Sequence, residues 1–154
     1  MKKYIGTKLI EAEPLTRGQY NERKGIQMDV GPNPYEAGYL VRYADGYESW
    51  SPAEAFEKAY LQIDDNQNLP SGVSIGEKMV DEFISHVETH TLGERTTVVC
   101  CVLRNGFEIV ESSSCVDPKN YSEEIGHDIC MGKIKDKIWE LLGFLLQTAW
   151  HGIR

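Results

Sequence analysis

Apolar residues recur along the chain with two periods, and each period predicts its own kind of element. Alternation every second residue predicts strands, whereas spacings of three and four predict amphipathic helices. The predicted strands are residues 3–12, 39–43, 47–50, 96–103 and 107–112. The predicted helices are residues 15–25, 51–63, 75–91 and a long final segment that carries residues 125–145.

The final helix is the longest amphipathic segment. Its apolar positions keep to one broad face, so the pattern predicts a single stripe that covers the hairpin before it. The stripe consists of Ile125, Ile129, Ile134, Ile138, Leu141, Leu142 and Leu145. The apolar end from Ile138 to Leu146 exceeds what two strands and one helix can cover, which favours a homo-oligomer or docking between domains.

Turn and cap residues separate the predicted elements. Asp45-Gly46 and Asn105-Gly106 are strong hairpin signals. Thr16 can cap the helix that Gly25 ends, and Ser51 can cap the helix that starts near Pro52.

Two polar segments lack a periodic pattern. The turn-forming residues at 28–38 predict an exposed loop, and the stretch 64–72 predicts a linker. We therefore expect an α+β protein with two small modules, residues 1–65 and 73–154. Each is expected to be an antiparallel β-hairpin or sheet covered by amphipathic helices.

Composition narrows the class of protein. A chain of 154 residues with 41% hydrophobic and 26% charged residues is typical of a globular protein. The net charge of -8 repels nucleic-acid backbones, so general nucleic-acid binding is not expected. No apolar run is long enough for a membrane span or a signal peptide, which predicts a cytoplasmic protein.

Cysteine and histidine do not form a metal-binding motif. Cys100 and Cys101 are adjacent in a predicted strand and point to opposite faces, so reduced thiols are expected. His86 and His90 are four apart on the predicted helix, but the residue after His86 is valine and no third ligand motif follows. We expect neither a metal nor a cofactor.

A loop before the final helix is the first candidate site. It carries Ser113, Asp117 and Asn120, and free N–H groups at a helix start favour a phosphate or carboxylate. The alternative is that Asp117 and Asn120 only cap the turn and the helix. A cysteine hydrolase would need Cys115 close to a base such as His127, and we expect no enzyme here.

An aromatic group near the first hairpin is the second candidate site. Exposed tyrosines could stack on a base while arginines bind a phosphate. The alternative is that the aromatic rings form the packed face of a small sheet. The candidate ligand-binding residues are Arg17, Tyr20, Arg23, Tyr39, Tyr43, Tyr47 and Trp50.

The C-terminal half resembles a family of small uncharacterised phage proteins named after the products of coliphage N-four gene 49 and Shigella phage Sf-six gene 66. The resemblance rests on residues 105–107, 111–118, 120–121, 124–126, 137–141 and 143–146. The N-terminal half resembles a module that recurs in phages and prophages, through residues 4–8, 16–21, 38–41 and 45–52.

The resemblance implies an accessory protein of a phage or prophage, located in the cytoplasm of a host bacterium, without an assigned reaction. Small proteins of this kind often act on host functions or against host defence, by analogy. The expected function is therefore non-enzymatic binding, with sequestration of a small nucleotide immune signal as the leading hypothesis. Direct capture of a host defence protein and a cysteine hydrolase are the alternatives.

Overall fold

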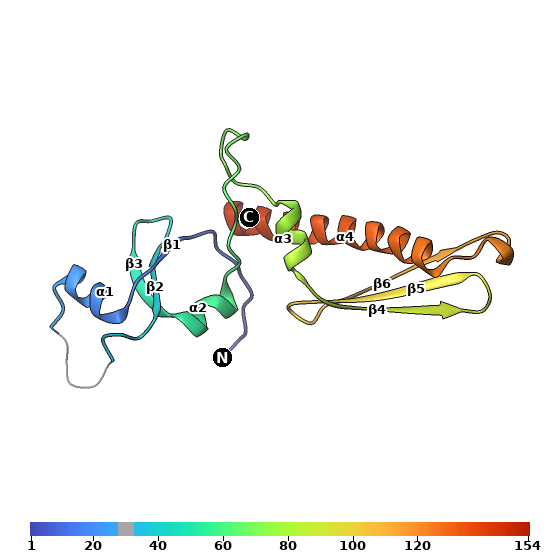
Figure 1. Cartoon of the computed structure of the whole chain (residues 1–154). Helices are drawn as coiled ribbons and strands as arrows, with labels where there is room; N and C mark the ends of the chain where they lie inside the picture. The colour runs from blue at the N-terminus through green and yellow to red at the C-terminus, as the bar shows by residue number, and fades with distance from the viewer. Residues whose placement is uncertain (28–32) are drawn as a thin grey trace. The chain divides into compact units, whose positions relative to one another are not determined.

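The computed structural model describes residues 1–27 and 33–154, so residues 28–32 of the predicted loop at 28–38 lie outside the described part. The chain divides into two compact units (Figure 1). The N-terminal unit comprises Met1–Gln62 with Thr148–Arg154, and the C-terminal unit comprises Ile63–Gln147. Each unit contains one three-stranded antiparallel sheet, which confirms the predicted α+β class.

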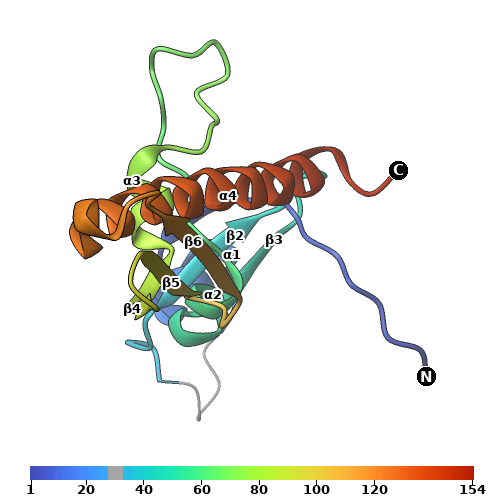
Figure 2. The same ribbon diagram turned by 90° about the vertical axis from the view of Figure 1, so that its right-hand side faces the viewer.

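The C-terminal unit is a three-stranded meander with a long helix over one face (Figure 2). The strand order is β4-β5-β6, which makes β5 the central strand. Its elements are α3 (Glu77–Glu82), β4 (Ile84–Leu92), β5 (Thr96–Leu103), β6 (Glu108–Ser114), the 3-10 helix η1 (Pro118–Asn120) and α4 (Glu123–His151) up to Gln147. The last turn of α4, from Thr148, belongs to the N-terminal unit. None of the helices in the described part of the chain could span a membrane.

The core of this unit lies between β5 and α4. Alternate residues of β5 are buried, as a strand with one covered face requires. Helix α4 buries residues at a constant spacing of four, the geometry of an i±4 ridge laid along a sheet. The buried residues are Thr97, Val99, Cys101 and Leu103 from β5, and Gly126, Cys130, Ile134, Ile138 and Leu142 from α4.

Helix α4 lies close against β5 at Gly126. A Cβ atom at this position would overlap the side chain of Thr97, so only glycine permits the approach. One turn later the Cys130 thiol donates to the Thr97 carbonyl at 3.8 Å. The thiols of Cys101 and Cys130 are buried, and burial raises the pKa of each.

The predicted single stripe on the final helix is wrong in part. Ile134, Ile138 and Leu142 are buried, whereas Ile125, Ile129, Leu141 and Leu145 are exposed. A sheet of three strands accommodates one narrow ridge of the helix, and Gly126 fixes which ridge that is. The remaining apolar residues stay on other sides of α4.

The predicted helix at 75–91 is also wrong beyond its first turns, because α3 ends at Glu82 and strand β4 follows. The register of β4 against β5 shifts between Ile84 and His86, which marks a bulge. The extra residue places Ile84 and Val87 three apart, a spacing that imitates a helix. Beyond the bulge, β-branched residues alternate with polar residues and pair with β5.

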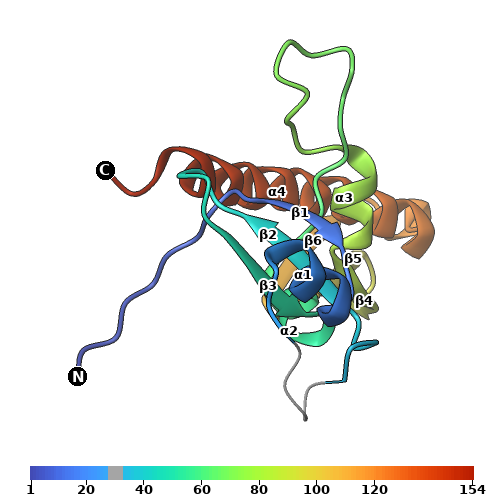
Figure 3. The ribbon, with the colours of Figure 1, turned by 90° about the vertical axis from the view of Figure 1, so that its left-hand side faces the viewer.

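The N-terminal unit contains a sheet of order β1-β2-β3 together with two short helices (Figure 3). Leu40 and Val41 are its buried apolar residues in the central strand. The predicted cap at Thr16 and the predicted end at Gly25 of the first helix are confirmed. The elements are β1 (Glu11–Pro14), α1 (Arg17–Lys24), β2 (Gly38–Arg42), β3 (Glu48–Pro52) and α2 (Ala53–Ala59).

The predicted boundaries of the first strand and of the second helix are wrong. The first strand begins at Glu11 and includes Pro14, which an edge strand tolerates because its outer side needs no backbone donor. Ser51 belongs to β3 and pairs with Tyr39, so it does not cap α2, which also ends earlier than predicted, at Ala59. Strand pairing therefore continued through the residues expected to start the helix.

A single carboxylate holds three cations together beside this sheet. Glu48 accepts hydrogen bonds from Lys24 (2.8 Å) and Arg42 (3.1 Å), and Arg23 lies 3.5 Å away. Its side chain is only 14% exposed. The hydrogen bonds from Lys24 and then Arg42 lower the pKa of Glu48 below its ordinary value.

We expect Glu48→Gln to remove part of the acid sensitivity of the protein. Because the folded-state pKa is lowered, the carboxylate stabilises the fold fully above its unfolded pKa of about 4.3. That contribution is lost as the pH falls through the lower folded value. Urea unfolding from pH 7 to pH 3 should therefore show a stability gap between wild type and variant that closes in acid. Glu54→Gln, in an exposed ion pair with Lys58, is the control. A gap that stays constant over this range would contradict the assignment.

We expect Gly126→Ala to destabilise the C-terminal unit by about 1–3 kcal/mol, because the new methyl group must push α4 away from Thr97. Chemical denaturation monitored by far-UV circular dichroism measures the change. Asp128→Ala, an exposed substitution on the same helix, should change stability by less than about 0.5 kcal/mol. Equal effects of the two substitutions would show that the close approach is unimportant.

Candidate functional site

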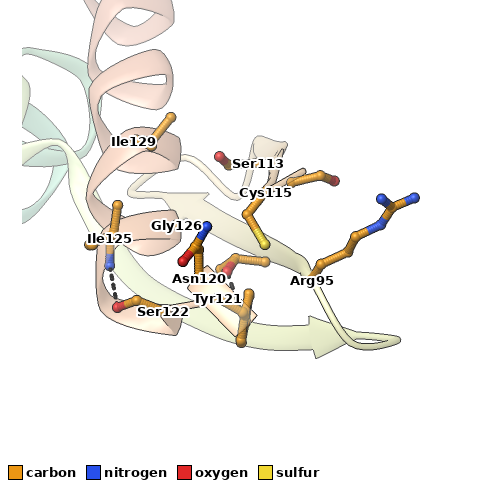
Figure 4. A pocket seen from close by; sticks show the side chains of 11 residues that line it. Arg95, Ser113, Cys115, Asn120, Tyr121, Ser122, Ile125, Gly126 and Ile129 are labelled. Atoms are coloured by element: carbon orange, nitrogen blue, oxygen red, sulfur yellow. Dashed lines mark hydrogen bonds between the residues drawn. The ribbon is translucent and has the colours of Figure 1, made fainter. Parts of the chain in front are cut away.

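A cavity of about 130 Å³ lies where the loop after β6 meets the start of α4 (Figure 4). Its walls come from the β4–β5 turn, the end of β6, the loop around η1 and the first two turns of α4. The lining residues are Arg95, Thr97, Ser113, Ser114, Cys115, Asn120, Tyr121, Ser122, Ile125, Gly126 and Ile129. We call this cavity the α4 pocket.

Hydrogen bonds within the loop give the α4 pocket its shape. The Asp117 carboxylate accepts from the Lys119 N–H at 2.9 Å and caps η1, as one of the two sequence interpretations proposed. The Cys115 thiol donates to the Asp117 carbonyl at 3.2 Å. Asp117 does not line the pocket, whereas Ser113 and Asn120 do.

A chain of hydroxyl groups includes Tyr121 and Thr97, which both line the α4 pocket. The Thr91 hydroxyl donates to the Glu123 carboxylate at 2.6 Å, so it accepts from the Tyr121 hydroxyl at 2.7 Å. The Tyr121 hydroxyl also lies 3.0 Å from the buried Thr97 hydroxyl. Because the proton of Tyr121 points to Thr91, Thr97 is the donor in this hydrogen bond. This chain orients Tyr121 and ties the start of α4 to β4 and β5.

The charge of the α4 pocket comes from Arg95. Among the described residues that line the pocket, it carries the positive charge, and one guanidinium N–H donates to the Val116 carbonyl at 3.2 Å. Ser122 caps α4 by accepting from the Ile125 N–H at 3.3 Å. The pocket therefore combines a guanidinium, hydroxyls and a helix N-terminus, a combination that suits a phosphate or a carboxylate.

Sequence reasoning missed Arg95. Its turn, which contains Gly93 at a φ of +63°, follows a strand that the pattern presented as a helix. Once β4 is recognised as a strand, the turn at 93–95 completes a hairpin with β5. The pairing of β5 with β6 sets Thr96 opposite Ser114, and this register places Arg95 beside Cys115, whose N–H donates to the Arg95 carbonyl.

The thiol and the base that a cysteine hydrolase would need, Cys115 and His127, are not hydrogen-bonded to each other but to other groups. The His127 imidazole Nδ1 lies 2.8 Å from the Thr89 hydroxyl, whereas the Cys115 thiol bonds to the backbone of its own loop. His86 and His90 lie on β4 and flank Glu88 at 3.9 and 3.6 Å. Within residues 1–27 and 33–154, no cluster of three or more His, Cys, Asp or Glu side chains could hold a metal ion.

The aromatic group of the N-terminal unit is largely stacked on itself. Tyr39 stacks on Phe56 with ring centroids 4.1 Å apart, and Phe56 stacks on Tyr60. Tyr43 stacks on Tyr47, and Tyr47 remains 64% exposed. The exposed face of Tyr47 is therefore the part of this row that is open to a ligand.

The candidate arginines of the N-terminal unit already have partners. The Arg17 guanidinium lies 4.4 Å from the Trp50 ring centroid and bonds to Glu36. Trp50 is half-buried and donates its indole N–H to the Leu15 carbonyl at 2.7 Å. Arg23 forms ion pairs with Glu13 and Glu48. The Lys24 ammonium lies over the Tyr20 ring, 5.9 Å from its centroid. A ligand here would have to displace these carboxylates.

Comparison with known proteins identifies the segment that carries the α4 pocket. Comparisons with curated proteins and with solved structures give no match. The resemblance of the N-terminal half to a recurrent phage module stays a prediction. Residues 75–150 match the model of a family described as Phage protein (N4 Gp49/phage Sf6 gene 66). The C-terminal part of the chain thus belongs to this phage protein family, as its sequence predicted.

Proposed function

We propose that this phage protein acts by reversible binding, and that its ligand is a small phosphate-bearing nucleotide signal of host defence. The observation that carries the proposal is the α4 pocket, whose lining includes Arg95, Ser113 and Asn120 together with Ser122, the residue that caps α4. These groups bind an anion without any covalent step.

The size of the pocket limits what enters it. A volume of about 130 Å³ is well below the roughly 300–1,000 Å³ of pockets that enclose a drug-sized ligand. One phosphate group fits, and the rest of a nucleotide would lie outside against exposed apolar surface such as Val116. The net charge of -8 does not oppose this, because a single local guanidinium suffices.

Capture of a host protein is the second candidate function. It is favoured by large exposed side chains in both units, such as Tyr47 and Phe144. A hydrolase would use the Cys115 thiol, whose hydrogen bond to the Asp117 carbonyl supplies no base.

Depletion of nucleotides by the purified protein separates these functions. The protein is mixed with a panel of cyclic and ADP-ribose-type nucleotides, filtered, and the filtrate is analysed by chromatography. We expect one nucleotide to be depleted and to reappear unchanged when the protein is heat-denatured. A changed product would indicate an enzyme, and Cys115→Ser would then test the thiol. Absence of depletion would favour capture of a host protein.

Substitution of the pocket residues locates the binding. Arg95→Gln and Asn120→Ala should each weaken binding about tenfold or more, because each removes a hydrogen-bond donor, charged in the case of Arg95. Arg104→Gln in the β5–β6 turn is the matched control, since it removes an exposed arginine outside the pocket. Isothermal titration calorimetry with the depleted nucleotide measures the dissociation constant of each of the three variants. Unchanged affinity in both pocket variants would reject the α4 pocket as the site.

A further inference from the structure

A second stripe of residues runs along α4 on a side that does not face the sheet. Its members alternate in spacing between four and three, the heptad period of a coiled-coil seam. Ile125 is 61% exposed and Trp139 is 40% exposed. The stripe, here called the seam, consists of Ile125, Ile129, Gly132, Asp136, Trp139, Gly143, Leu146 and Trp150.

The two glycines of the seam have no role in the packing of this chain. A Cβ atom at Gly132 or Gly143 would meet nothing within 4 Å, in contrast to Gly126. Glycine destabilises a helix interior relative to alanine. Packing among the described residues does not require glycine at either position, so nothing in that part of the chain compensates for that loss of stability. Glycines on an exposed helix face allow the backbone of another helix to come close.

We propose that the seam pairs with the seam of a second copy of this chain in an antiparallel direction. One register places every seam residue opposite a suitable partner and spans about 37 Å of helix. The facing pairs, each formed twice, are Ile125 with the partner's Trp150, Ile129 with the partner's Leu146, Gly132 with the partner's Gly143, and Asp136 with the partner's Trp139.

Charge selects both the second copy and the direction. Parallel pairing in register would set Asp136 against the same carboxylate of the partner. Antiparallel pairing instead sets it against Trp139, whose indole N–H is a donor that a buried carboxylate requires. Lys133 and Glu140 flank the seam on one edge, where each comes level with the opposite charge on the partner.

Engineered disulfides test the register directly in the full chain. The double variant Gly132→Cys with Gly143→Cys should form a disulfide-linked dimer under mild oxidation. In the proposed register, the new thiol at position 132 faces the new thiol at position 143 of the partner. Either single variant, and the wild type with its four native cysteines, should remain unlinked. Efficient linking of a single variant would reveal parallel pairing and overturn the proposal.

Light scattering tests the association itself. At about 50 μM the wild type should have twice the 17.5 kDa mass of the chain, and Trp139→Ala should raise the dissociation constant about tenfold or more. Glu140→Lys should also weaken the dimer, and adding Lys133→Glu to it should restore affinity. Circular dichroism checks that each variant folds. A wild-type monomer at this concentration, or failure of the charge exchange to restore affinity, would overturn the proposal.

Discussion

The contact between Gly126 of α4 and Thr97 of β5 sets the geometry of the C-terminal unit. It fixes the rotation of the helix about its own axis, and hence which ridge enters the core. The Thr97 hydroxyl also bonds to the Tyr121 hydroxyl, and both residues line the α4 pocket. Packing and pocket therefore depend on the same threonine, and a change that loosens one should loosen the other.

Local signals in the sequence predicted the parts of the fold that local chemistry determines. The turns at Asp45-Gly46 and Asn105-Gly106 both hold a glycine at positive φ, which hairpins of this kind require. The caps at Thr16 and Gly25 are also local and were correct. The α+β class followed from these elements.

The errors occurred where distant residues decide the outcome. A bulge near Ile84 gave a strand the spacing of a helix, and only pairing with β5 reveals it. The apolar pattern of α4 could not show that Gly126 would turn Ile125 and Ile129 outward. At the pocket, Ser113 and Asn120 were within reach of local reasoning, whereas Arg95 required the register of β5 against β6 beyond the predicted end of β6. Burial and cross-strand neighbours are tertiary properties that one sequence encodes only indirectly.

The final turn of α4 has a consequence for the order of folding during synthesis. The N-terminal unit includes Thr148–Arg154, and the Leu9 N–H donates to the Ala149 carbonyl at 3.0 Å. Domains generally fold as they leave the ribosome, with the N-terminal one first. Here the first unit to be made lacks a structural part until nearly the whole chain is synthesised. The C-terminal unit, whose residues are contiguous, can be completed before the N-terminal unit is. Truncation of the last residues would therefore remove a part of the N-terminal unit.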